Sequence, residues 1–397
     1  MKQIQMQDTY IKKIKNMQKN KKYSILTMGC QLNENDSERI SGILEEAGYE
    51  KTEDLSCANI IVFNTCCVRE NAEDRLFGKL GEVKKYKEKN GCIIAIGGCM
   101  MQEKHMQRKI KESYQFVDII FGPHTLKNFP EDLYKSIIEN KKIEDILDID
   151  GEIIEGIPTV REDKIKASVT IMNGCNNFCT YCIVPYVRGR ERSRHPQDIY
   201  NEVVNLAKQG YKEITLLGQN VNSYLVSEKS KGEDVNFIVK EENGNEYEVN
   251  SFATLLRLIN KIKGIERIRF ISPHPKDFTD DVIDSIRDSK KVCKLIHLPL
   301  QSGSTEILKS MNRKYTKEEY LNLVKKIKSK IPEVEFSTDI IVGFPGETEK
   351  DFEDTLDVVS KVKYEQIYMF IYSRRVGTKA DKMENQIDED IKHERFE

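Results

Sequence analysis

Three cysteines in the middle of the chain, Cys175, Cys179 and Cys182, form a C-x3-C-x2-C run. Thiolates at this spacing can hold an iron–sulfur cluster, and a four-iron cluster takes four ligands. Because only three ligands are local, the run predicts a cluster with one iron left open for a small molecule. A zinc site is the alternative, with His195 as a conceivable fourth ligand, but no second pair of zinc ligands lies nearby in the sequence.

The open iron fits the amino and carboxylate groups of S-adenosylmethionine (SAM), and reduction of such a complex gives a carbon radical. In this run the chain resembles the radical SAM superfamily. The resemblance implies that Cys175, Cys179 and Cys182 are catalytic ligands of a 4Fe–4S cluster, and that SAM is a cofactor.

A second set of cysteines, Cys30, Cys66 and Cys99, follows three short apolar runs that are typical of buried strands. Helix-compatible segments at 35–47 and 71–89 come after the first two runs, which predicts a parallel sheet with helices on both faces. Ligands of such sheets lie at the carboxyl ends of the strands, where these three thiols would meet. From the residues alone, a second cluster and three structural thiols are about equally supported.

Cys67 competes with Cys66 for the ligand role, because adjacent residues of a strand point to opposite faces. The stretches around the three cysteines resemble the N-terminal domain of the methylthiotransferases. That resemblance implies an auxiliary 4Fe–4S cluster on Cys30, Cys66 and Cys99, and it selects Cys66 over Cys67. The residues that carry it are Gly29-Cys30-Gln31-Leu32-Asn33, Asn64-Thr65-Cys66-Cys67-Val68-Arg69-Glu70 and Gly98-Cys99-Met100.

The second half of the chain alternates strand and helix patterns, which predicts a partial (β/α)6 barrel of the α/β class. Chemistry in such barrels belongs at the carboxyl ends of the strands. We therefore expect Gly218, Gln219, Gly343 and Glu347, which follow two of these strands, to line the SAM site. The six strand candidates are residues 168–172, 213–217, 267–271, 294–300, 335–342 and 364–372.

Four arginines alternate after the cysteine run, at Arg188, Arg190, Arg192 and Arg194. In an extended chain they would point along one edge, and guanidinium forks suit carboxylates and phosphates. One hypothesis is contact with RNA phosphates. The other is an internal salt-bridge network, or a clasp on the carboxylate of the cofactor.

Patterns and resemblance together divide the chain into segments. Residues 226–250 form an acidic insertion in the second half of the chain, and they are predicted to contain a hairpin that turns at Asn243-Gly244. The methylthiotransferase family normally continues into a small RNA-binding β-barrel, which the sequence suggests is missing. The segments are a basic tail at 1–22, an N-terminal methylthiotransferase domain at 23–140, a linker at 141–164, a radical SAM domain at 165–380 with the insertion at 226–250, and a C-terminal segment at 381–397.

Composition sets broader limits. The 397 residues carry a formal net charge of −2, so no overall basic field indicates nucleic-acid binding. Neither an apolar run of transmembrane length nor a signal peptide is recognisable, so we expect a cytoplasmic protein that does not bind membranes. In that compartment the ten cysteines are more typical of metal or redox ligands than of disulfides.

Residues 171–191 and Gln31-Leu32-Asn33 resemble the branch of the family that modifies N6-(dimethylallyl)adenosine in tRNA. The resemblance implies methylthiolation of carbon 2 of this base, next to the anticodon at tRNA position 37, with two SAM and a cluster-bound sulfur. It also implies the tRNA anticodon loop, a flavodoxin- or ferredoxin-type electron donor and a sulfur donor as partners.

Three alternatives remain. One is the same chemistry on ribosomal protein S12 or on threonylcarbamoyladenosine in tRNA. A second is a non-catalytic iron–sulfur electron carrier, which would not turn over SAM. The third is a zinc-stabilised RNA-binding module, which would be colourless.

Overall fold

The computed structural model describes residues 2–17, 21–68, 72–147, 153 and 155–397. The chain divides into two compact units: unit 1 holds residues 1–162 and 186–189, and unit 2 holds residues 163–185 and 190–397. Arg69 and Glu70 of the second cysteine motif lie outside the described residues, as do residues 148–152 and 154 of the predicted linker.

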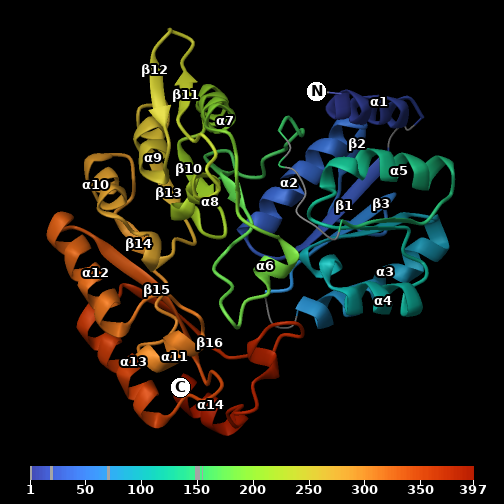
Figure 1. Cartoon of the computed structure of the whole chain (residues 1–397). Coiled ribbons are helices and arrows are strands. Elements are labelled where there is room, and N and C mark those ends of the chain that lie inside the picture. Colours follow the sequence, from blue (N-terminus) through green and yellow to red (C-terminus); the bar gives the residue numbers. More distant parts are fainter. Residues whose placement is uncertain (1, 18–20, 69–71, 148–152, 154) are drawn as a thin grey trace. The chain divides into compact units, whose positions relative to one another are not determined.

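Unit 1 contains a six-stranded parallel sheet in the order β2-β1-β3-β4-β5-β6, of which β1, β2 and β3 are labelled in Figure 1. All six residues of β3 are buried, because helices cover both faces of the sheet. Continuous apolar runs such as Ile60–Phe63 are therefore the expected strand pattern. The strands are β1 (Lys21–Met28), β2 (Tyr49–Lys51), β3 (Ile60–Thr65), β4 (Ile93–Gly98), β5 (Ile119–Phe121) and β6 (Ile143–Asp145).

Two hydrophobic layers attach the helices to this sheet. Ile11 of α1, Ile43 of α2 and Phe129 of α5 belong to the core on one face. Leu76 of α3 and Ile110 of α4 belong to the core on the other face. The helices are α1 (Lys2–Met17), α2 (Gln31–Glu46), α3 (Ala72–Asn90), α4 (Lys104–Ser113) and α5 (Phe129–Ile138).

Parts of unit 1 differ from the segments expected from the sequence. The predicted basic tail contains α1, whose Ile11 and Ile14 are buried against the sheet. The predicted linker from residue 141 contains β6, which pairs with β5. A three-residue strand is too short for a recognisable apolar pattern, and the sequence of α1 is dominated by lysine and glutamine.

Unit 2 contains two three-stranded parallel sheets, with orders β13-β10-β7 and β14-β15-β16. The α/β class expected from the sequence is therefore present in both units. The strands β10 and β15 have the predicted limits. The strands are β7 (Lys166–Thr170), β10 (Glu213–Leu217), β13 (Arg267–Phe270), β14 (Leu295–His297), β15 (Glu335–Val342) and β16 (Gln366–Ile371).

Amphipathic helices follow these strands and bury their apolar faces in one core. Ser251, Thr316 and Thr348 begin α9, α12 and α13 with capping boxes. The helices after α5 are α6 (Val184–Val187), α7 (Pro196–Lys208), α8 (Val226–Ser230), α9 (Phe252–Asn260), α10 (Asp280–Asp288), α11 (Thr305–Ser310), α12 (Lys317–Lys330), α13 (Glu349–Val362) and α14 (Glu389–Phe396).

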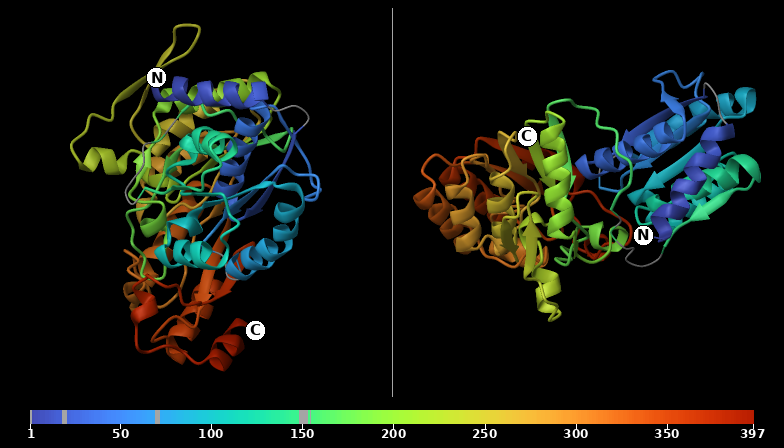
Figure 2. Two further views of the ribbon diagram at one scale, coloured as in Figure 1. Left: turned by 90° about the vertical axis from the view of Figure 1, so that its right-hand side faces the viewer. Right: turned by 90° about the horizontal axis from the view of Figure 1, so that it is seen from above.

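The insertion at 226–250 contains the predicted hairpin, formed by β11 (Phe237–Lys240) and β12 (Glu246–Val249). It extends beyond the neighbouring helices of unit 2 (Figures 1 and 2). Val239 and Val249 are nevertheless fully buried in the core of that unit. The hairpin is thus anchored by its apolar face, and its acidic residues lie mainly on the outside.

Candidate iron–sulfur sites

Cys30, Cys66 and Cys99 follow three neighbouring strands of the unit 1 sheet. Cys30 comes between β1 and α2, Cys66 directly follows β3, and Cys99 directly follows β4. Because β1, β3 and β4 are adjacent and parallel, their carboxyl ends lie at the same edge of the sheet. The fold therefore brings together three thiols that are 36 (66 − 30) and 33 (99 − 66) residues apart in sequence.

The thiols at this edge interact with one another. Hydrogen bonding to Cys66 and the positive charge of Arg188 lower the pKa of Cys30 to about 6. Hydrogen bonding to Cys67, together with Arg188, also lowers the pKa of Cys99. Their partners, Cys66 and Cys67, have raised pKa values because they donate to these thiolates and are buried. Metal binding needs deprotonated thiolates, and at this edge Cys30 and Cys99 are the two thiols whose lowered pKa favours that form.

Cys67 lies against Cys99 in this group, although the family pattern assigned the ligand role to Cys66. We predict that Cys67→Ala keeps the iron bound to unit 1, whereas Cys66→Ala loses it, because only Cys66 is expected to bind an iron. Iron content per chain after anaerobic reconstitution measures the difference. The reverse result would assign the third ligand to Cys67.

Two buried asparagines fix the end of β3 against the start of α2. The Asn33 amide donates to the carbonyl of Thr65 at 2.9 Å, and its Oδ1 accepts from Sγ of Cys30 at 3.3 Å. Asn64 donates back to the carbonyl of Asn33 at 2.8 Å. Both asparagines are at most 1% exposed. In a low-dielectric interior such reciprocal bonds specify one arrangement, so they hold Cys30 in place relative to Cys66.

Gly98 places the backbone that carries Cys99. Its φ is +97°, and a Cβ built there would lie 2.3 Å from the carbonyl oxygen of Thr65. Only glycine tolerates both this conformation and this approach to a neighbouring strand.

The other three cysteines, Cys175, Cys179 and Cys182, occupy the loop that follows β7 and the short strand β8 (Met172–Asn173) in unit 2. Cys175 and Cys179 are buried, and Cys182 is half-buried. Burial raises the pKa of both Cys175 and Cys182 to about 12. These thiols therefore need a bound cation to become thiolates at neutral pH.

Hydrogen bonds from the segment after α11 hold the backbone of this cysteine loop. Asn312 donates its side-chain amide to the carbonyls of Asn177 and Phe178, each at 3.0 Å. The backbone N–H of Thr180 donates to the carbonyl of Met311 at 3.0 Å. Phe178 has a φ of +48°, which is unusual for a bulky residue. The loop thus adopts a conformation that its surroundings maintain.

Glu191 holds the start of the loop from the opposite side. Its carboxylate accepts from the backbone N–H of Asn176, from the Asn220 amide and from the Ser223 hydroxyl, each at 3.2 Å. Glu191 is 3% exposed, and burial raises its pKa. No local sequence pattern predicts this role of Glu191, since its donors lie 15 to 32 residues away along the chain.

Arg313 is a further buried residue at this loop, and no sequence motif predicts its place there. Its Nη1 donates to Sγ of Cys179 at 3.5 Å. Its other hydrogen bonds go to neutral groups, the Tyr315 hydroxyl at 2.9 Å and the Pro299 carbonyl at 3.2 Å. The position of Arg313, two residues after Met311, carries no local signal of this contact.

Three buried amide oxygens lie on residues of the cysteine loop and of the loop after β10. Asn177 Oδ1, Gln219 Oε1 and Asn220 Oδ1 have no hydrogen-bond partner among the described residues. An unpaired buried acceptor is costly unless a ligand supplies the donor. The amino group of SAM is such a donor, so these residues fit the predicted cofactor. Gly218 has no room for a side chain, because a Cβ there would lie 2.6 Å from Cγ of Met172.

Glu347, which is expected to line the SAM site, makes its hydrogen bonds within its own loop and to α14. Its carboxylate accepts from the N–H of Gly343 at 2.7 Å and pairs with Arg395 of α14 at 2.8 Å. The Glu347 side chain is only 1% exposed. Glu347 therefore closes its own loop, and a cofactor contact by Gly343 or Glu347 stays a prediction.

The four alternating arginines do not share one exposed edge. Arg188 and Arg194 are buried, at 5% and 4% exposure, and Arg194 pairs with Glu202 at 2.7 Å. Arg190 lies over the ring of Phe178, 4.4 Å from its centroid, and Arg192 is half-buried in the short strand β9 (Arg192–Ser193). For Arg188 and Arg194 the structure favours the internal hypothesis, because buried guanidinium groups are not available to RNA.

Arg188 belongs to unit 1, although it follows the cysteine loop in sequence. Its Nε donates to Sγ of Cys99 at 3.0 Å, and its Nη2 pairs with Asp36 of α2 at 2.8 Å. The guanidinium is thus fixed between a carboxylate and one of the three thiols at the sheet edge.

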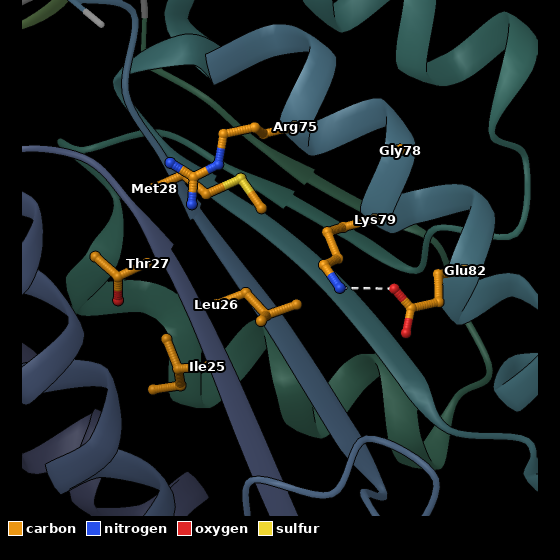
Figure 3. Close-up of a pocket in the computed structure, with 8 residues that line it drawn as sticks. All are labelled: Ile25, Leu26, Thr27, Met28, Arg75, Gly78, Lys79 and Glu82. Carbon is orange, nitrogen blue, oxygen red and sulfur yellow. Dashed lines mark hydrogen bonds and ion pairs between the residues drawn. The ribbon is translucent and has the colours of Figure 1, made fainter. Parts of the chain in front are cut away.

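A pocket of about 350 Å³ lies beside β1 and α3 and is separate from the cysteines. Ile25–Met28 line one side, and Arg75, Lys79 and Glu82 line the other, where Lys79 pairs with Glu82 (Figure 3). None of the predicted site residues lines this pocket. Among the described residues, no three His, Cys, Asp or Glu side chains are close enough to bind one metal ion. The ligands of a four-iron cluster bind separate irons and lie further apart.

Two family models match the chain. Residues 169–359 match the Radical SAM superfamily, and residues 22–122 match the model described as Uncharacterized protein family UPF0004. No helix within the described residues is long and apolar enough to cross a membrane.

Curated relatives match almost the whole chain. The tRNA-2-methylthio-N(6)-dimethylallyladenosine synthase of Clostridium botulinum (strain Eklund 17B / Type B) is 55% identical over 394 residues, which are 99% of this chain and 82% of the relative. The protein of the same name from Acetivibrio thermocellus is 53% identical, over 98% of this chain and 77% of the relative.

Solved structures with the same fold are more distant in sequence. The radical SAM methyltransferase TsrM from Kitasatospora setae has a TM-score of 0.61 at 13% identity, covering 90% of this chain and 75% of its own. The cobalamin-dependent SAM radical enzyme OxsB has a TM-score of 0.57 at 13% identity, covering 95% of this chain and 56% of its own. At such identities the likeness concerns the fold alone.

Proposed function

This chain belongs to the family of tRNA-2-methylthio-N6-dimethylallyladenosine synthases, and we infer that it is a radical SAM methylthiotransferase that modifies tRNA. The reaction replaces the hydrogen on carbon 2 of N6-(dimethylallyl)adenosine with a methylthio group. The observation that carries this proposal at the level of residues is the pair of cysteine sets at strand ends, one in each unit.

We propose that each set holds its own 4Fe–4S cluster, Cys30, Cys66 and Cys99 in unit 1 and Cys175, Cys179 and Cys182 in unit 2. When bound, the clusters and SAM supply the radical that removes the hydrogen atom and the sulfur that replaces it. Two observations support the fit: the unpaired amide oxygens beside the second set, and a buried arginine beside each set.

The residues of the chain hold and orient these groups and do not act as a general base. Carbon 2 of adenine carries an unactivated C–H bond, and no side chain of accessible pKa removes that proton. Glu191 and Asn312 fix the backbone of the loop 175–182 through the hydrogen bonds described above. Asn33 and Asn64 do the same for the edge that carries Cys30.

The remaining elements are assigned by the same proposal. The two three-stranded sheets of unit 2 form a partial (β/α)6 barrel that carries the loop 175–182. The substrate base leaves its stack in the anticodon loop to reach the site, at a cost of roughly a few kcal/mol. Exposed Arg190 and half-buried Arg192 are the arginines of the run that remain candidates for RNA contact. A low-potential electron donor and a sulfur donor complete the set of partners.

The decisive experiment uses anaerobically reconstituted full-length chain with SAM, dithionite and tRNA that carries N6-(dimethylallyl)adenosine. We expect roughly eight irons per chain, as two four-iron clusters require, and 2-methylthio nucleoside in mass spectra of the digested tRNA. Parallel reactions with ribosomal protein S12 and with threonylcarbamoyladenosine tRNA should give no product. Iron without SAM cleavage would indicate an electron carrier, and a colourless protein that binds zinc would overturn the proposal.

A further inference from the structure

Each cysteine set contains one buried arginine that donates a hydrogen bond to a ligand thiol. In unit 1, Nε of Arg188 lies 3.0 Å from Sγ of Cys99. In unit 2, Nη1 of Arg313 lies 3.5 Å from Sγ of Cys179. Arg188 is 5% exposed and Arg313 is 9% exposed. The two sites thus repeat the same arrangement of thiol and guanidinium on unrelated elements.

A guanidinium stays protonated in proteins, so burying one requires a compensating negative charge. The carboxylate of Asp36, 2.8 Å from the guanidinium, supplies part of this negative charge for Arg188. Among the described residues, Arg313 forms no ion pair with a carboxylate, and besides Cys179 its hydrogen bonds go to a hydroxyl and a carbonyl. Its charge is therefore balanced only when the neighbouring cysteines are thiolates on an anionic cluster.

We propose that Arg188 and Arg313 are positioning residues that raise the reduction potentials of the clusters on Cys30, Cys66 and Cys99 and on Cys175, Cys179 and Cys182, respectively. The inference rests on the proposed function, because it requires a cluster at each set. One-electron reduction adds a negative charge to a cluster and its thiolates. A fixed positive charge and a hydrogen bond to one sulfur stabilise the reduced form more than the oxidised form.

The two sites should differ in the size of this effect. Asp36 offsets part of the charge of Arg188 and also fixes its orientation. Arg313 has no such carboxylate, so its field at the sulfur is less compensated, although its hydrogen bond is longer. We expect the loss of Arg313 to lower its cluster's potential more than the loss of Arg188 lowers the other.

The test measures midpoint potentials by dithionite titration followed by EPR, on full-length chains that retain one cluster each. The first background keeps only the unit 1 cluster, because Cys175, Cys179 and Cys182 are all changed to Ala. The second background keeps only the unit 2 cluster, because Cys30, Cys66 and Cys99 are all changed to Ala. Arg188→Gln should lower the potential of the first background by about 59 mV, a tenfold change in the one-electron reduction equilibrium. Arg313→Gln should lower the potential of the cluster in the second background by more than this. Each Arg→Lys variant should lower the potential of its cluster by less than the corresponding Gln variant does.

Each arginine is the matched control for the other. Arg313→Gln should leave the potential unchanged in the background that keeps only the unit 1 cluster. Arg188→Gln should likewise leave the potential unchanged in the background that keeps only the unit 2 cluster. A bound cluster whose potential does not move, or moves equally with the control substitution, overturns the inference and leaves the proposed function standing. A background that binds no iron overturns both the inference and the proposed function. If a Gln variant does not fold, the Lys variant decides, and an unmoved potential there overturns the inference.

Discussion

Replacing either Cys66 or Cys179 with alanine is expected to abolish formation of the 2-methylthio nucleoside. Each substitution would remove one of the three proposed protein ligands of one cluster, and two thiolates do not hold a four-iron cluster firmly. The proposed reaction requires both clusters, because one would supply the radical and the other the sulfur. We expect product to fall at least about a thousandfold, as it does when an essential catalytic group is removed.

Two measurements separate loss of chemistry from loss of fold. Nucleoside mass spectrometry measures the product, and iron content should fall from roughly eight to roughly four per chain in each variant. Cys57→Ala is the matched control, since Cys57 is exposed, precedes β3 while Cys66 follows it, and donates its thiol to Asp54 at 3.1 Å. The control should keep full product and all its iron. Full methylthiolation by Cys179→Ala would falsify the assignment.

The second large effect is expected at Gly98. An alanine there would place its Cβ 2.3 Å from the carbonyl oxygen of Thr65, in a backbone conformation with φ of +97°. The conformation alone costs about 1–3 kcal/mol, and relieving the clash must move β3 or β4. We expect unit 1 to lose at least about 3 kcal/mol of stability, a large effect for one substitution. Because Cys99 is the next residue, the iron of unit 1 should also be lost.

Gly78→Ala is the control for this prediction. Gly78 lies on α3, beside the pocket of Figure 3, and no atom lies within 4 Å of its ideal Cβ position. An alanine in a helix is better than glycine by roughly 0.5–1 kcal/mol, so the control should be slightly stabilised. Urea denaturation and iron content measure both variants. Equal behaviour of the two glycine variants would contradict the steric explanation.

The sequence was most informative where apolar runs are long. The predicted limits of β10 and β15 agree with the structure. These strands have five and eight residues, and most of their side chains are buried, which gives the apolar pattern of a strand. Cysteine spacing was equally informative for Cys175, Cys179 and Cys182, where all three ligands lie within one loop. Short or polar elements were missed: β2 and β6 have three residues each, and α4 carries only two buried side chains.

Contacts between distant residues could not be predicted from local patterns. The alternation of the arginines left open both an RNA-contacting edge and an internal salt-bridge network, and Arg188 and Arg194 are buried in separate ion pairs. No local pattern predicts that Glu347 pairs with Arg395 of α14. The Cys67–Cys99 contact likewise depends on how β3 and β4 end. In each case the deciding partner lies more than seven residues away.

The membership of Arg188 in unit 1 has a consequence for protein synthesis. The first stretch of unit 1 ends at Glu162, but the unit also includes Gly189, which is 27 residues later (189 − 162). At roughly 5–20 residues per second, the ribosome needs about 1–5 s to reach it. Cys175, Cys179 and Cys182 are translated within that interval. The first three thiols therefore cannot receive their guanidinium partner until all six ligands have been made. The second set waits longer for its own partner, because Arg313 is translated 125 residues (313 − 188) after Arg188.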